Sequence, residues 1–570
     1  MKTALLSSLA KVFPDELAGG QVKKLTLFQN ERGNFQLAYK LDAPGDAGMV
    51  YPVIKSSLPV SEYRVGYVPV VRACPAKHDE GFARTTPGLY PDPLFARRKE
   101  HPVHDEGRFS TLWVEEGEKE LLTAVGDSWQ SLWLTVNGEE ELLKPGEYEI
   151  VIRLVRSGDP DEFSEERLAV EILPAELKEQ TLLVTNWFYA DCLADHYGVE
   201  VFSDRHFEIM SSFMKAAAEH GQNMILLPAF TPPLDTSVGK ERKTAQLVGV
   251  TVENGAYAFD FALLERYIKT AQAAGITHFE HSHMFTQWGA ENAPKIMATV
   301  NGEQKRIFGW ETNAKGEEYK AFLRAYFKAL FPVLEKLGVK EKTWFHTSDE
   351  PDENTFESYK EAAAIMREVT CGATLFDALS HYRFAEMNTT DVPVVAENSP
   401  DMEKFIQSGR PFWAYYTGGQ VVANNANRLI SNLSVRNRML GVMLYATGAS
   451  GFLHWGYNFY YDILSHGHFD PNAYPGTYVQ LPGTSFIVYP SPDGKAVPSL
   501  RMKVFEEAVS DHRALCRLAE VTSREEVMKI IEKHFGKLGY SYDMTEEALL
   551  SFREEVNDAF REKKKERSAV

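Results

Sequence analysis

The sequence lacks the features that mark disulfide scaffolds, zinc domains, membrane proteins and nucleic-acid binders. Its 570 residues include four cysteines, which lie far apart and form no Cys-x-x-Cys pair, so neither a thiolate zinc site nor a disulfide framework is expected. No stretch approaches the ~20 uninterrupted apolar residues of a membrane span. Acidic residues outnumber basic ones by 80 to 61. That balance argues against a dedicated nucleic-acid or anionic-membrane binder, which would need a basic face.

The N-terminal segment lacks the pattern of a secretion signal. In MKTALLSSLAKVFPDE, Lys11 interrupts a short apolar run, and no convincing small-residue cleavage site follows. We therefore expect an intracellular, cytoplasmic protein. The sequence leaves open whether the chain forms a homo-oligomer.

Residues 1–178 predict an antiparallel β-sandwich. Short segments rich in β-branched and aromatic residues, several of them alternating, are separated by turn signals. These segments are LTLFQNERGNFQLAYKL, EYRVGYVPVVRA, STLWVEEG, SLWLTVNG and GEYEIVIRLVRSG. A proline-rich segment, CPAKHDEGFARTTPGLYPDPLF (74–95), interrupts the series. It is too long for a simple hairpin, and we expect it to be either a lid or a packing arm.

From residue 179 a different pattern repeats, in which a helix tail and a glycine precede a short apolar strand. The glycines are expected as left-handed helix C-caps; they are Gly221, Gly275, Gly338, Gly372, Gly409 and Gly448. With TLLVTNWF (181–188) and VPVVAEN (392–398), eight strands alternate with helices, which predicts a (β/α)8 TIM barrel. A doubly wound open sheet is the alternative, weakened because no G-x-G-x-x-G follows any strand.

Residues 522–570 predict a charged, helical C-terminal extension, which we interpret as a solvated amphipathic appendage. The chain is thus expected to be multidomain, with an all-β domain over 1–178, an α/β barrel over 179–521 and a helical tail over 522–570.

The segment TWFHTSDEP, 343–351, carries the strongest chemical signal. An apolar strand runs into the adjacent carboxylates Asp349 and Glu350, which in a barrel would lie at the catalytic face. Because neighbouring carboxylates resist ionising together, one pKa is expected to rise. A raised pKa is what a general acid needs near neutral pH. The alternative is that Asp349 caps the next helix and Glu350 is solvated.

The residues leave the nucleophile open. A retaining glycosidase of the two-carboxylate type needs a second carboxylate ~5–5.5 Å from the acid, and Glu397 and Asp377 are candidates. In the other scheme the 2-acetamido oxygen of the substrate attacks the anomeric carbon. Asp349 would then orient the acetamido group, and Glu350 would protonate the leaving oxygen.

Aromatic and histidine side chains accompany the predicted strand ends. Aromatic faces stack on sugar rings, and Tyr415 and Tyr416 are the best placed, since one of two neighbours on a strand faces inward. His278, His281 and His283 alternate in HFEHSHMF. Without an H-E-x-x-H motif we expect them to be hydrogen-bonded polar groups rather than metal ligands, so no metal or other cofactor is predicted.

Several segments taken in order resemble glycoside hydrolase family 123 and its relatives of the domain-of-unknown-function-4091 type, over residues 180–515. They are WFYADCLADHY, ILLPAFTPPLDT, HFEHSHMFTQWGAENAPKI, FHTSDEP, FWAYY, GFLHWGYNFYYD and FIVYPSPDGKAVPSLRMKVFEEAVSD. The resemblance implies a (β/α)8 catalytic domain behind a β-sandwich. It also implies retaining hydrolysis of β-linked N-acetylgalactosamine, with the acetamido group as nucleophile.

The resemblance also assigns residues. It implies Asp349 as the stabiliser of the acetamido group and Glu350 as the acid/base. It places Glu280, His283, Tyr415 and Trp455 along the carbohydrate substrate. A carbohydrate-binding protein without turnover is the alternative of another class, and the intact Asp-Glu pair argues against it.

Overall fold

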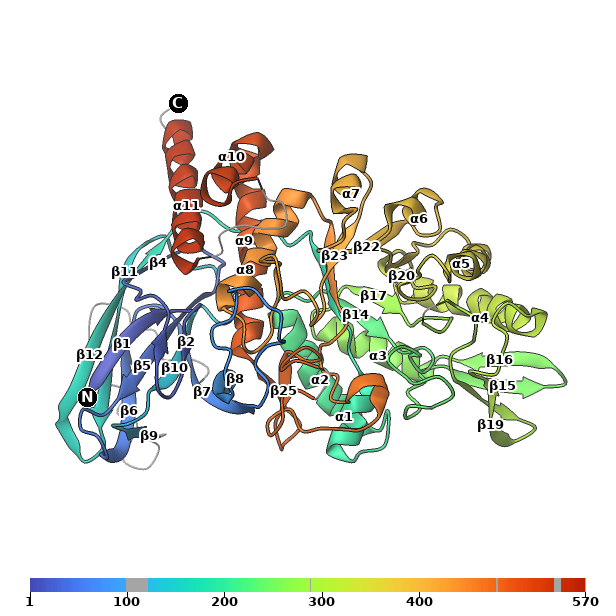
Figure 1. The fold of residues 1–570 in the computed structure, drawn as a ribbon, viewed down its shortest axis with the longest axis horizontal. Helices are drawn as coiled ribbons and strands as arrows, with labels where there is room; N and C mark the ends of the chain where they lie inside the picture. Colours follow the sequence, from blue (N-terminus) through green and yellow to red (C-terminus); the bar gives the residue numbers. More distant parts are fainter. Residues whose placement is uncertain (99–120, 288, 478–479, 538–544, 569–570) are drawn as a thin grey trace. The chain divides into compact units, whose positions relative to one another are not determined.

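The computed structural model describes residues 1–98, 121–287, 289–477, 480–537 and 545–568. Contacts group the chain, drawn in Figure 1, into two compact units. The first comprises residues 1–180, 421–446 and 497–570, and the second comprises 181–420 and 447–496. This grouping follows contacts rather than sequence order. The three domains predicted from the sequence stay a prediction.

The first unit holds two five-stranded sheets that are antiparallel except for one pair, β4 and β12. One sheet has the order β1 (Lys2–Ser7), β5 (Gly33–Lys40), β10 (Gln130–Val136), β7 (Val60–Val70), β8 (Gly88–Arg98). The other has the order β4 (Lys24–Leu27), β12 (Asp159–Ile172), β11 (Gly146–Arg156), β6 (Ala47–Lys55), β9 (Leu122–Val125). A short pair, β2 (Lys11–Val12) and β3 (Leu17–Ala18), adds to them.

Inward-facing side chains of the two sheets form one apolar core. Leu37 and Leu134 of the first sheet join Ile152 and Val170 of the second in a single buried cluster. Alternate residues of a strand point to opposite faces, and β5, β10, β11 and β12 each supply every second residue to this core. The antiparallel sheets predicted for the N-terminal region are therefore present. The predicted strand STLWVEEG lies outside the described residues.

The proline-rich segment 74–95 divides into two parts. Its second half enters strand β8. In its first half, the Asp79 carboxylate accepts hydrogen bonds from Arg436 at 2.7 and 3.0 Å, and Phe82 forms a β-bridge with Asn432. All four residues belong to the first unit, so within that unit the segment packs as an arm.

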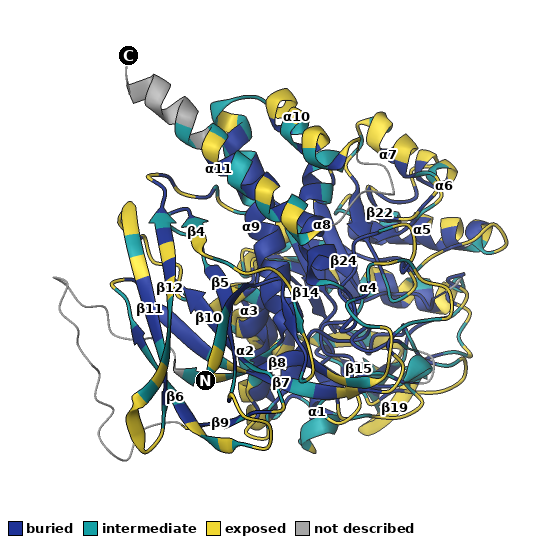
Figure 2. Cartoon of the chain, turned by 60° about the vertical axis from the view of Figure 1, so that its left-hand side comes forward, coloured by how far each residue is buried: buried dark blue, intermediate teal, exposed yellow. Residues whose placement is uncertain are grey.

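The C-terminal helices are present, but their interpretation as a solvated appendage is wrong. α10 (Arg524–Phe535) and α11 (Glu546–Ser568) bury one face each in a cluster with α8 (Ser434–Thr447) and α9 (Leu500–Val521). Leu549, Phe552 and Val556 are fully buried there, at the i, i+3, i+7 spacing of an amphipathic helix. Figure 2 shows the corresponding alternation of buried and exposed residues along α11 and the nearly continuous burial of α9.

A buried ion network joins these helices to one another and to the turn between β4 and β5. The Asp511 carboxylate accepts hydrogen bonds from Arg438 at 2.7 and 3.1 Å and from Arg553 at 2.6 Å. Arg553 also donates to Glu31 at 2.9 Å, and Arg438 donates to Glu507 at 3.0 Å. The two arginines hold the pKa of Asp511 below its ordinary value, although burial alone would raise it. A cavity of about 320 Å³, lined in part by Arg438, Glu507 and Arg553, lies beside the network.

Replacing Asp511 with alanine should strongly destabilise the protein. The change leaves two buried guanidinium groups without their shared partner, and breaking a buried pair in this way costs about 3–5 kcal/mol. Urea unfolding measures the loss. Asp558→Ala on α11 is the matched control, because its pair with Arg561 is exposed. Equal unfolding midpoints for the two variants would contradict the prediction.

The second unit is built on eight parallel strands, the same eight that the sequence predicted. In chain order they are β13 (Leu183–Asn186), β14 (Met224–Leu227), β17 (His278–His281), β20 (Thr343–Phe345), β21 (Phe376–Ala378), β22 (Val392–Ala396), β23 (Trp413–Tyr415) and β24 (Gly451–His454). Neighbours in sequence are neighbours in the sheet, and β24 pairs with β13. A single parallel bridge, Phe345 to Leu375, links the remaining two edges, so the sheet forms a nearly closed barrel.

Helices separate the strands along the chain. They are α1 (Ala190–Tyr197), α2 (Asp204–Glu219), α3 (Ala262–Ala273), α4 (Glu317–Lys336), α5 (Phe356–Thr370), α6 (Tyr382–Glu386) and α7 (Met402–Ser408), followed by α8 and α9. The six predicted glycines all have positive φ, as left-handed caps require. The (β/α)8 pattern is irregular, because α6 has five residues and α8 and α9 group with the first unit.

The two long segments that follow β14 and β17 contain a sheet that the sequence analysis missed. Its order is β16 (Ala256–Asp260), β15 (Gly249–Glu253), β18 (Ile296–Val300), β19 (Glu303–Phe308). Each hairpin turns at an Asn-Gly pair in which both residues have positive φ: Asn254-Gly255 and Asn301-Gly302. Asn-Gly is the preferred sequence of such a turn. Short strands β25 (Val488–Pro490) and β26 (Ala496–Pro498) form a further pair.

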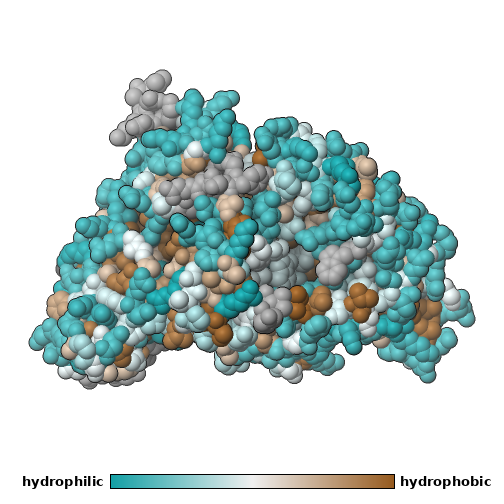
Figure 3. All heavy atoms as spheres, viewed as in Figure 1, coloured by the Kyte–Doolittle hydropathy of each residue, from teal (hydrophilic) through white to brown (hydrophobic). Residues whose placement is uncertain are grey.

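Hydrophilic residues cover most of the face shown in Figure 3, and hydrophobic residues occur there as small separate groups. Among the described residues, no helix combines the length and the apolar character needed to cross a bilayer.

Candidate active site

The Asp349–Glu350 pair follows the carboxyl end of strand β20. The connecting residues 346–348 are buried, whereas Asp349 is half-buried and Glu350 is exposed. Ser348 anchors this turn by donating a hydrogen bond to the Thr286 carbonyl at 2.6 Å. The two carboxylates therefore emerge from a fixed, buried turn at the end of the barrel where parallel barrels carry their chemistry.

Glu350 is held in an unusual backbone conformation. Its φ of 41° lies in the left-handed region, which costs a residue with a Cβ about 1 kcal/mol or more. Its carboxylate accepts a hydrogen bond from the hydroxyl of Tyr415, at the end of β23. Strain that persists at an exposed, hydrogen-bonded carboxylate is typical of functional sites.

Asp349 has a strongly shifted protonation equilibrium. Burial and the neighbouring Glu350 carboxylate raise its pKa well above the ordinary value, while His346 acts in the opposite direction. The pair therefore keeps a proton to higher pH than an ordinary aspartate would. This is the raised pKa that the sequence predicted for one member of the pair.

A buried charged group lies next to this turn. His346 Nδ1 lies 3.1 Å from Asp377 Oδ1, and its Nε2 lies 3.8 Å from Glu280 Oε1. Burial alone would lower the pKa of His346, but the Asp377 and Glu280 carboxylates raise it to about 9. The ring is therefore an imidazolium at neutral pH. Sequence analysis did not single out His346, because its partners come from strands β17 and β21, distant in sequence.

Asp377 is poorly suited to be a nucleophile. It is fully buried, and its oxygens accept hydrogen bonds from the Thr347 amide at 3.0 and 3.2 Å and from the Tyr359 hydroxyl at 2.8 Å, besides the His346 contact. Its lone pairs are thus already used. Glu397 is 5% exposed, and its amide donates to the Tyr415 carbonyl at 3.0 Å, which places it beside β23.

His283, His346 and Asp377 lie close enough together to be considered as metal ligands, since their ligand atoms fall within 4.8 Å of one another. The geometry does not suit a metal. The two imidazoles are stacked, with centroids 4.0 Å apart and planes 16° apart, whereas a shared ion must lie near the plane of both rings. The Asp377 oxygens are also occupied. We therefore interpret this cluster as a charged hydrogen-bonded group.

The four other predicted site residues divide into two pairs by what they contact and by whether they reach the surface. Tyr415 contacts Glu350, and Trp455 is half-buried after strand β24. Glu280 and His283 are 0% and 2% exposed. They lie around His346 and do not reach the surface. Tyr415 and Trp455 remain candidates for contact with substrate, and Glu280 and His283 are placed to support the turn that carries Asp349.

The neighbouring aromatic and histidine candidates are structural. Tyr416 is fully buried against Phe452 and His454, whereas the Tyr415 hydroxyl contacts Glu350. His281 is fully buried and hydrogen-bonded to Ser282 and to the Tyr326 hydroxyl.

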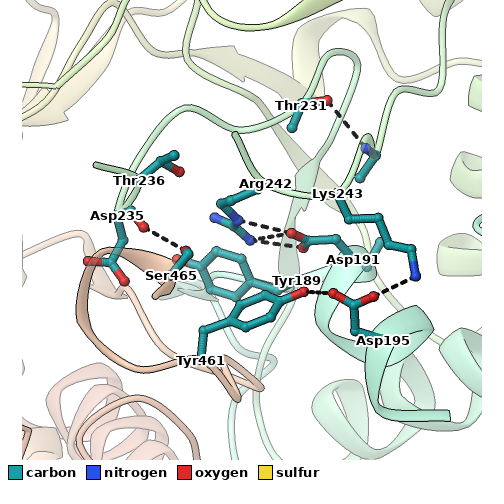
Figure 4. Close-up of polar contacts among 12 residues, drawn as sticks. Tyr189, Asp191, Asp195, Thr231, Asp235, Thr236, Arg242, Lys243, Tyr461 and Ser465 are labelled. Carbon is teal, nitrogen blue, oxygen red and sulfur yellow. Dashed lines mark hydrogen bonds and ion pairs between the residues drawn. The ribbon is translucent and has the colours of Figure 1, made fainter. Parts of the chain in front are cut away.

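The long segment after β14 is fixed by a buried ion pair, shown in Figure 4. Arg242 forms a bidentate pair with Asp191 of α1, with contacts of 2.7–2.9 Å, and its guanidinium lies 5.0 Å from the Tyr189 ring centroid. Lys243 and Tyr461 both donate to Asp195, one turn further along α1. A bidentate arginine contact fixes direction as well as distance. This segment at the carboxyl end of β14 is therefore firmly positioned.

Comparisons with known proteins agree with this architecture. The model of the glycoside hydrolase 123 catalytic domain matches residues 187–518. A family 123 glycoside hydrolase from Clostridium perfringens, solved in a study of glycolipid glycan hydrolysis, is 12% identical. The alignment covers 99% of this chain and 98% of that one, with a TM-score of 0.72.

Two further solved structures have low TM-scores, so their similarity to this chain says nothing about its function. A family 5 mannosidase from Rhizomucor miehei is 14% identical over 66% of this chain and 97% of its own, with a TM-score of 0.31. A putative beta-galactosidase from Bacteroides fragilis is 9% identical over 89% and 60%, also with a TM-score of 0.31. No curated protein matches the chain. The family model spans more than half of the chain, so the protein belongs to glycoside hydrolase family 123 and is an enzyme that hydrolyses O-glycosyl bonds.

Proposed function

We propose that the protein is a retaining hexosaminidase that cleaves β-linked 2-acetamido sugars, N-acetylgalactosamine first among them, by substrate-assisted catalysis. The catalytic domain is then the (β/α)8 barrel of residues 179–521, between the β-sandwich of 1–178 and the helical extension of 522–570. The observation that carries the proposal is the adjacent pair itself. A carboxyl with a raised pKa, Asp349, lies beside an exposed carboxylate, Glu350, that a tyrosine hydroxyl holds in place.

In the first step the acetamido oxygen of the bound sugar attacks the anomeric carbon while the bond to the leaving group breaks. Asp349 accepts a hydrogen bond from the acetamido N–H and stabilises the positive charge of the resulting oxazolinium ion. Glu350 donates its proton to the leaving oxygen.

In the second step Glu350 accepts a proton from water, and that water attacks the anomeric carbon. The bond to the acetamido oxygen breaks, and Asp349 again stabilises the charge as it disappears. Two displacements at the same carbon give retention of configuration. The reaction therefore needs one proton on the pair, and that proton must lie on Glu350 during the attack. In the free protein burial and the Glu350 carboxylate raise the pKa of Asp349, so the proton has to pass from Asp349 to Glu350 when the sugar binds.

The neighbouring residues take separate roles in this proposal. Tyr415 positions the Glu350 carboxylate, and the half-buried Trp455 offers an aromatic face to the sugar. Glu280 and His283 contact His346 rather than the sugar, and they act indirectly by holding that ring in place. The alternative with two protein carboxylates would require Glu397 as nucleophile, since the oxygens of Asp377 are occupied.

Substrate choice tests the proposal. Aryl β-N-acetylgalactosaminide and β-N-acetylglucosaminide should be compared with the matching aryl 2-hydroxy glycosides. Because only the acetamido sugars bring their own nucleophile, we expect kcat/KM to favour one of them over its 2-hydroxy counterpart by about 10³-fold or more. A thiazoline that mimics the oxazoline intermediate should inhibit strongly.

Two results would contradict the proposal. Comparable cleavage of the acetamido and hydroxy sugars would contradict substrate assistance and favour Glu397 as nucleophile. Sugar binding without turnover would indicate a binding protein. The Glu350→Gln variant, purified in parallel, excludes a contaminating hydrolase.

A further inference from the structure

We propose that a small pocket beside the catalytic turn binds an anionic substituent, a carboxylate or a sulfate ester, on the sugar to which the cleaved 2-acetamido sugar is linked. Lys240 supplies the positive charge, and the Trp310 ring supplies the surface on which that second sugar lies. The inference rests on the proposed function and extends it, because it names the class of leaving group that the enzyme prefers.

The pocket lies between the two long segments that follow strands β14 and β17. One wall includes Thr231 and Lys240, and the other includes Thr286, Lys295 and Trp310. Strands β14, β17 and β20, the last of which carries the catalytic pair, are consecutive in the barrel sheet. The volume of the pocket is about 20 Å³, too small for a whole sugar ring. A ring therefore lies over the pocket, and only a substituent enters it.

The wall of the pocket is in contact with the turn that carries Asp349 and Glu350. The Thr286 carbonyl accepts a hydrogen bond from the Ser348 hydroxyl at 2.6 Å, and Ser348 directly precedes Asp349. The bond lengths between them limit the distance from the Thr286 carbonyl oxygen to the Asp349 Cα to about 9 Å. A disaccharide whose glycosidic bond lies at Glu350 can therefore extend over the pocket.

One cation of the pocket has no carboxylate partner. The lining carries four cationic side chains and a single carboxylate, in a chain whose formal net charge is −19. Three of the cations form ion pairs, namely Arg242 with Asp191, and Lys295 and Arg306 with Glu241. The exposed Lys240 forms no ion pair with any residue that the structure describes. An anion on the substrate supplies the partner that this ammonium lacks.

The aromatic ring is attached to the lysine. Trp310 Nε1 donates a hydrogen bond to the Lys240 carbonyl at 3.0 Å, and the side chain of Trp310 is half-buried. Because the N–H is already used, the ring itself is what remains for a ligand. Aromatic rings pack on the apolar face of a sugar, so a ring beside an unpaired ammonium suits a sugar that carries an anionic group.

The two walls are fixed to each other. Gln246 Nε2 donates to the Met297 carbonyl at 2.8 Å, and the Met297 amide donates to Gln246 Oε1 at 2.9 Å. Lys295 Nζ donates to the Arg242 carbonyl at 3.2 Å, and the Arg242 side chain is held by Asp191 (Figure 4). A pocket with fixed walls loses little conformational freedom when a ligand binds, so a single ion pair there has a measurable effect.

The test compares kcat/KM for three substrates in the wild type and in Lys240→Gln. They are the 2-acetamido sugar β-linked to galactose, the same disaccharide with a sulfate ester on the galactose, and the same disaccharide with a sialic acid on the galactose. An exposed ion pair should favour at least one anionic substrate over the neutral one by about three- to fivefold. The anion that is favoured identifies the substituent. In Lys240→Gln, and in the wild type at about 0.5 M salt, the ratio should fall to about one.

Lys305→Gln is the matched control. Lys305 lies on strand β19 of the same long segment as Trp310, does not line the pocket and pairs with Glu303 at 2.8 Å. Its replacement removes the same charge, so the ratio of anionic to neutral substrate should equal that of the wild type. Trp310→Ala should lower kcat/KM for the neutral disaccharide relative to the aryl glycoside by about fivefold, and an unchanged value would overturn the role of the ring.

Two results would overturn the inference as a whole. One is equal kcat/KM for the neutral disaccharide and both anionic ones in the wild type, and the other is a preference that persists in Lys240→Gln. Calorimetry on Glu350→Gln, which should bind the disaccharides without cleaving them, must give the same order of affinities. Failure of the proposed function has a different signature, because the aryl 2-acetamido glycoside, which carries no second sugar, would then not be cleaved.

Discussion

Glu350→Gln should lower kcat/KM for a 2-acetamido sugar with a poor leaving group, such as an alkyl glycoside or a second sugar, by about 10²–10⁴-fold. An aryl glycoside with a strongly acidic phenol should lose far less in its first step, because that leaving group departs without a proton. The expected result is a steep dependence of rate on leaving-group pKa in the variant and a shallow one in the wild type.

The structure makes this variant a clean probe. Glutamine has nearly the same size as glutamate, and its amide oxygen still accepts the Tyr415 hydrogen bond. The positive φ of residue 350 is also left unchanged by this substitution. Only the transferable proton is lost. Steady-state kinetics on a series of phenols checks the prediction.

The control is Glu353→Gln, three residues further along the same loop. Glu353 is exposed and pairs with Arg383 at the surface, so its replacement should leave both classes of substrate unaffected. If Glu350→Gln slowed good and poor leaving groups by the same factor, Glu350 would not be the proton donor.

The barrel strands, and the position of two adjacent carboxylates at the end of one of them, could be predicted because their signals are local. A glycine adopts positive φ at a helix end at little cost, and all six predicted glycines have positive φ one or two residues after the last residue of a helix. The carboxylates Asp349 and Glu350 follow a recognisable apolar strand. The hairpins at Asn254-Gly255 and Asn301-Gly302 were missed although their signal is equally local, since alternating residues flank each Asn-Gly pair.

Other features could not be predicted because they depend on residues distant in sequence. Nothing near Asp191 indicates that Arg242 will be its partner, and nothing near His346 indicates Glu280. The C-terminal helices carried an apolar stripe, at Leu549 and Phe552 among others. An amphipathic pattern shows which face of a helix is buried, but not that a neighbouring surface exists to cover it.

Asp349→Asn should lower kcat/KM by about 10²–10³-fold for good and poor leaving groups alike. The asparagine can still accept a hydrogen bond from the acetamido group, but it carries no negative charge to stabilise the oxazolinium ion. That charge is needed whichever leaving group departs. Kinetics on the same series of phenols should therefore give a line parallel to that of the wild type.

A binding measurement separates loss of charge stabilisation from misfolding. The thiazoline analogue resembles the charged intermediate, so calorimetry should show much weaker binding to Asp349→Asn, whereas a plain 2-acetamido sugar should bind almost as well as it does to the wild type. The control is Asp352→Asn, an exposed loop residue whose carboxylate accepts backbone hydrogen bonds that an amide oxygen also accepts. Full activity of Asp349→Asn would show that the nucleophile is not the acetamido group. A rate that does not depend on the charge of residue 349 would mean that Asp349 has no part in stabilising the intermediate. Another carboxylate of the barrel would then have to act together with Glu350.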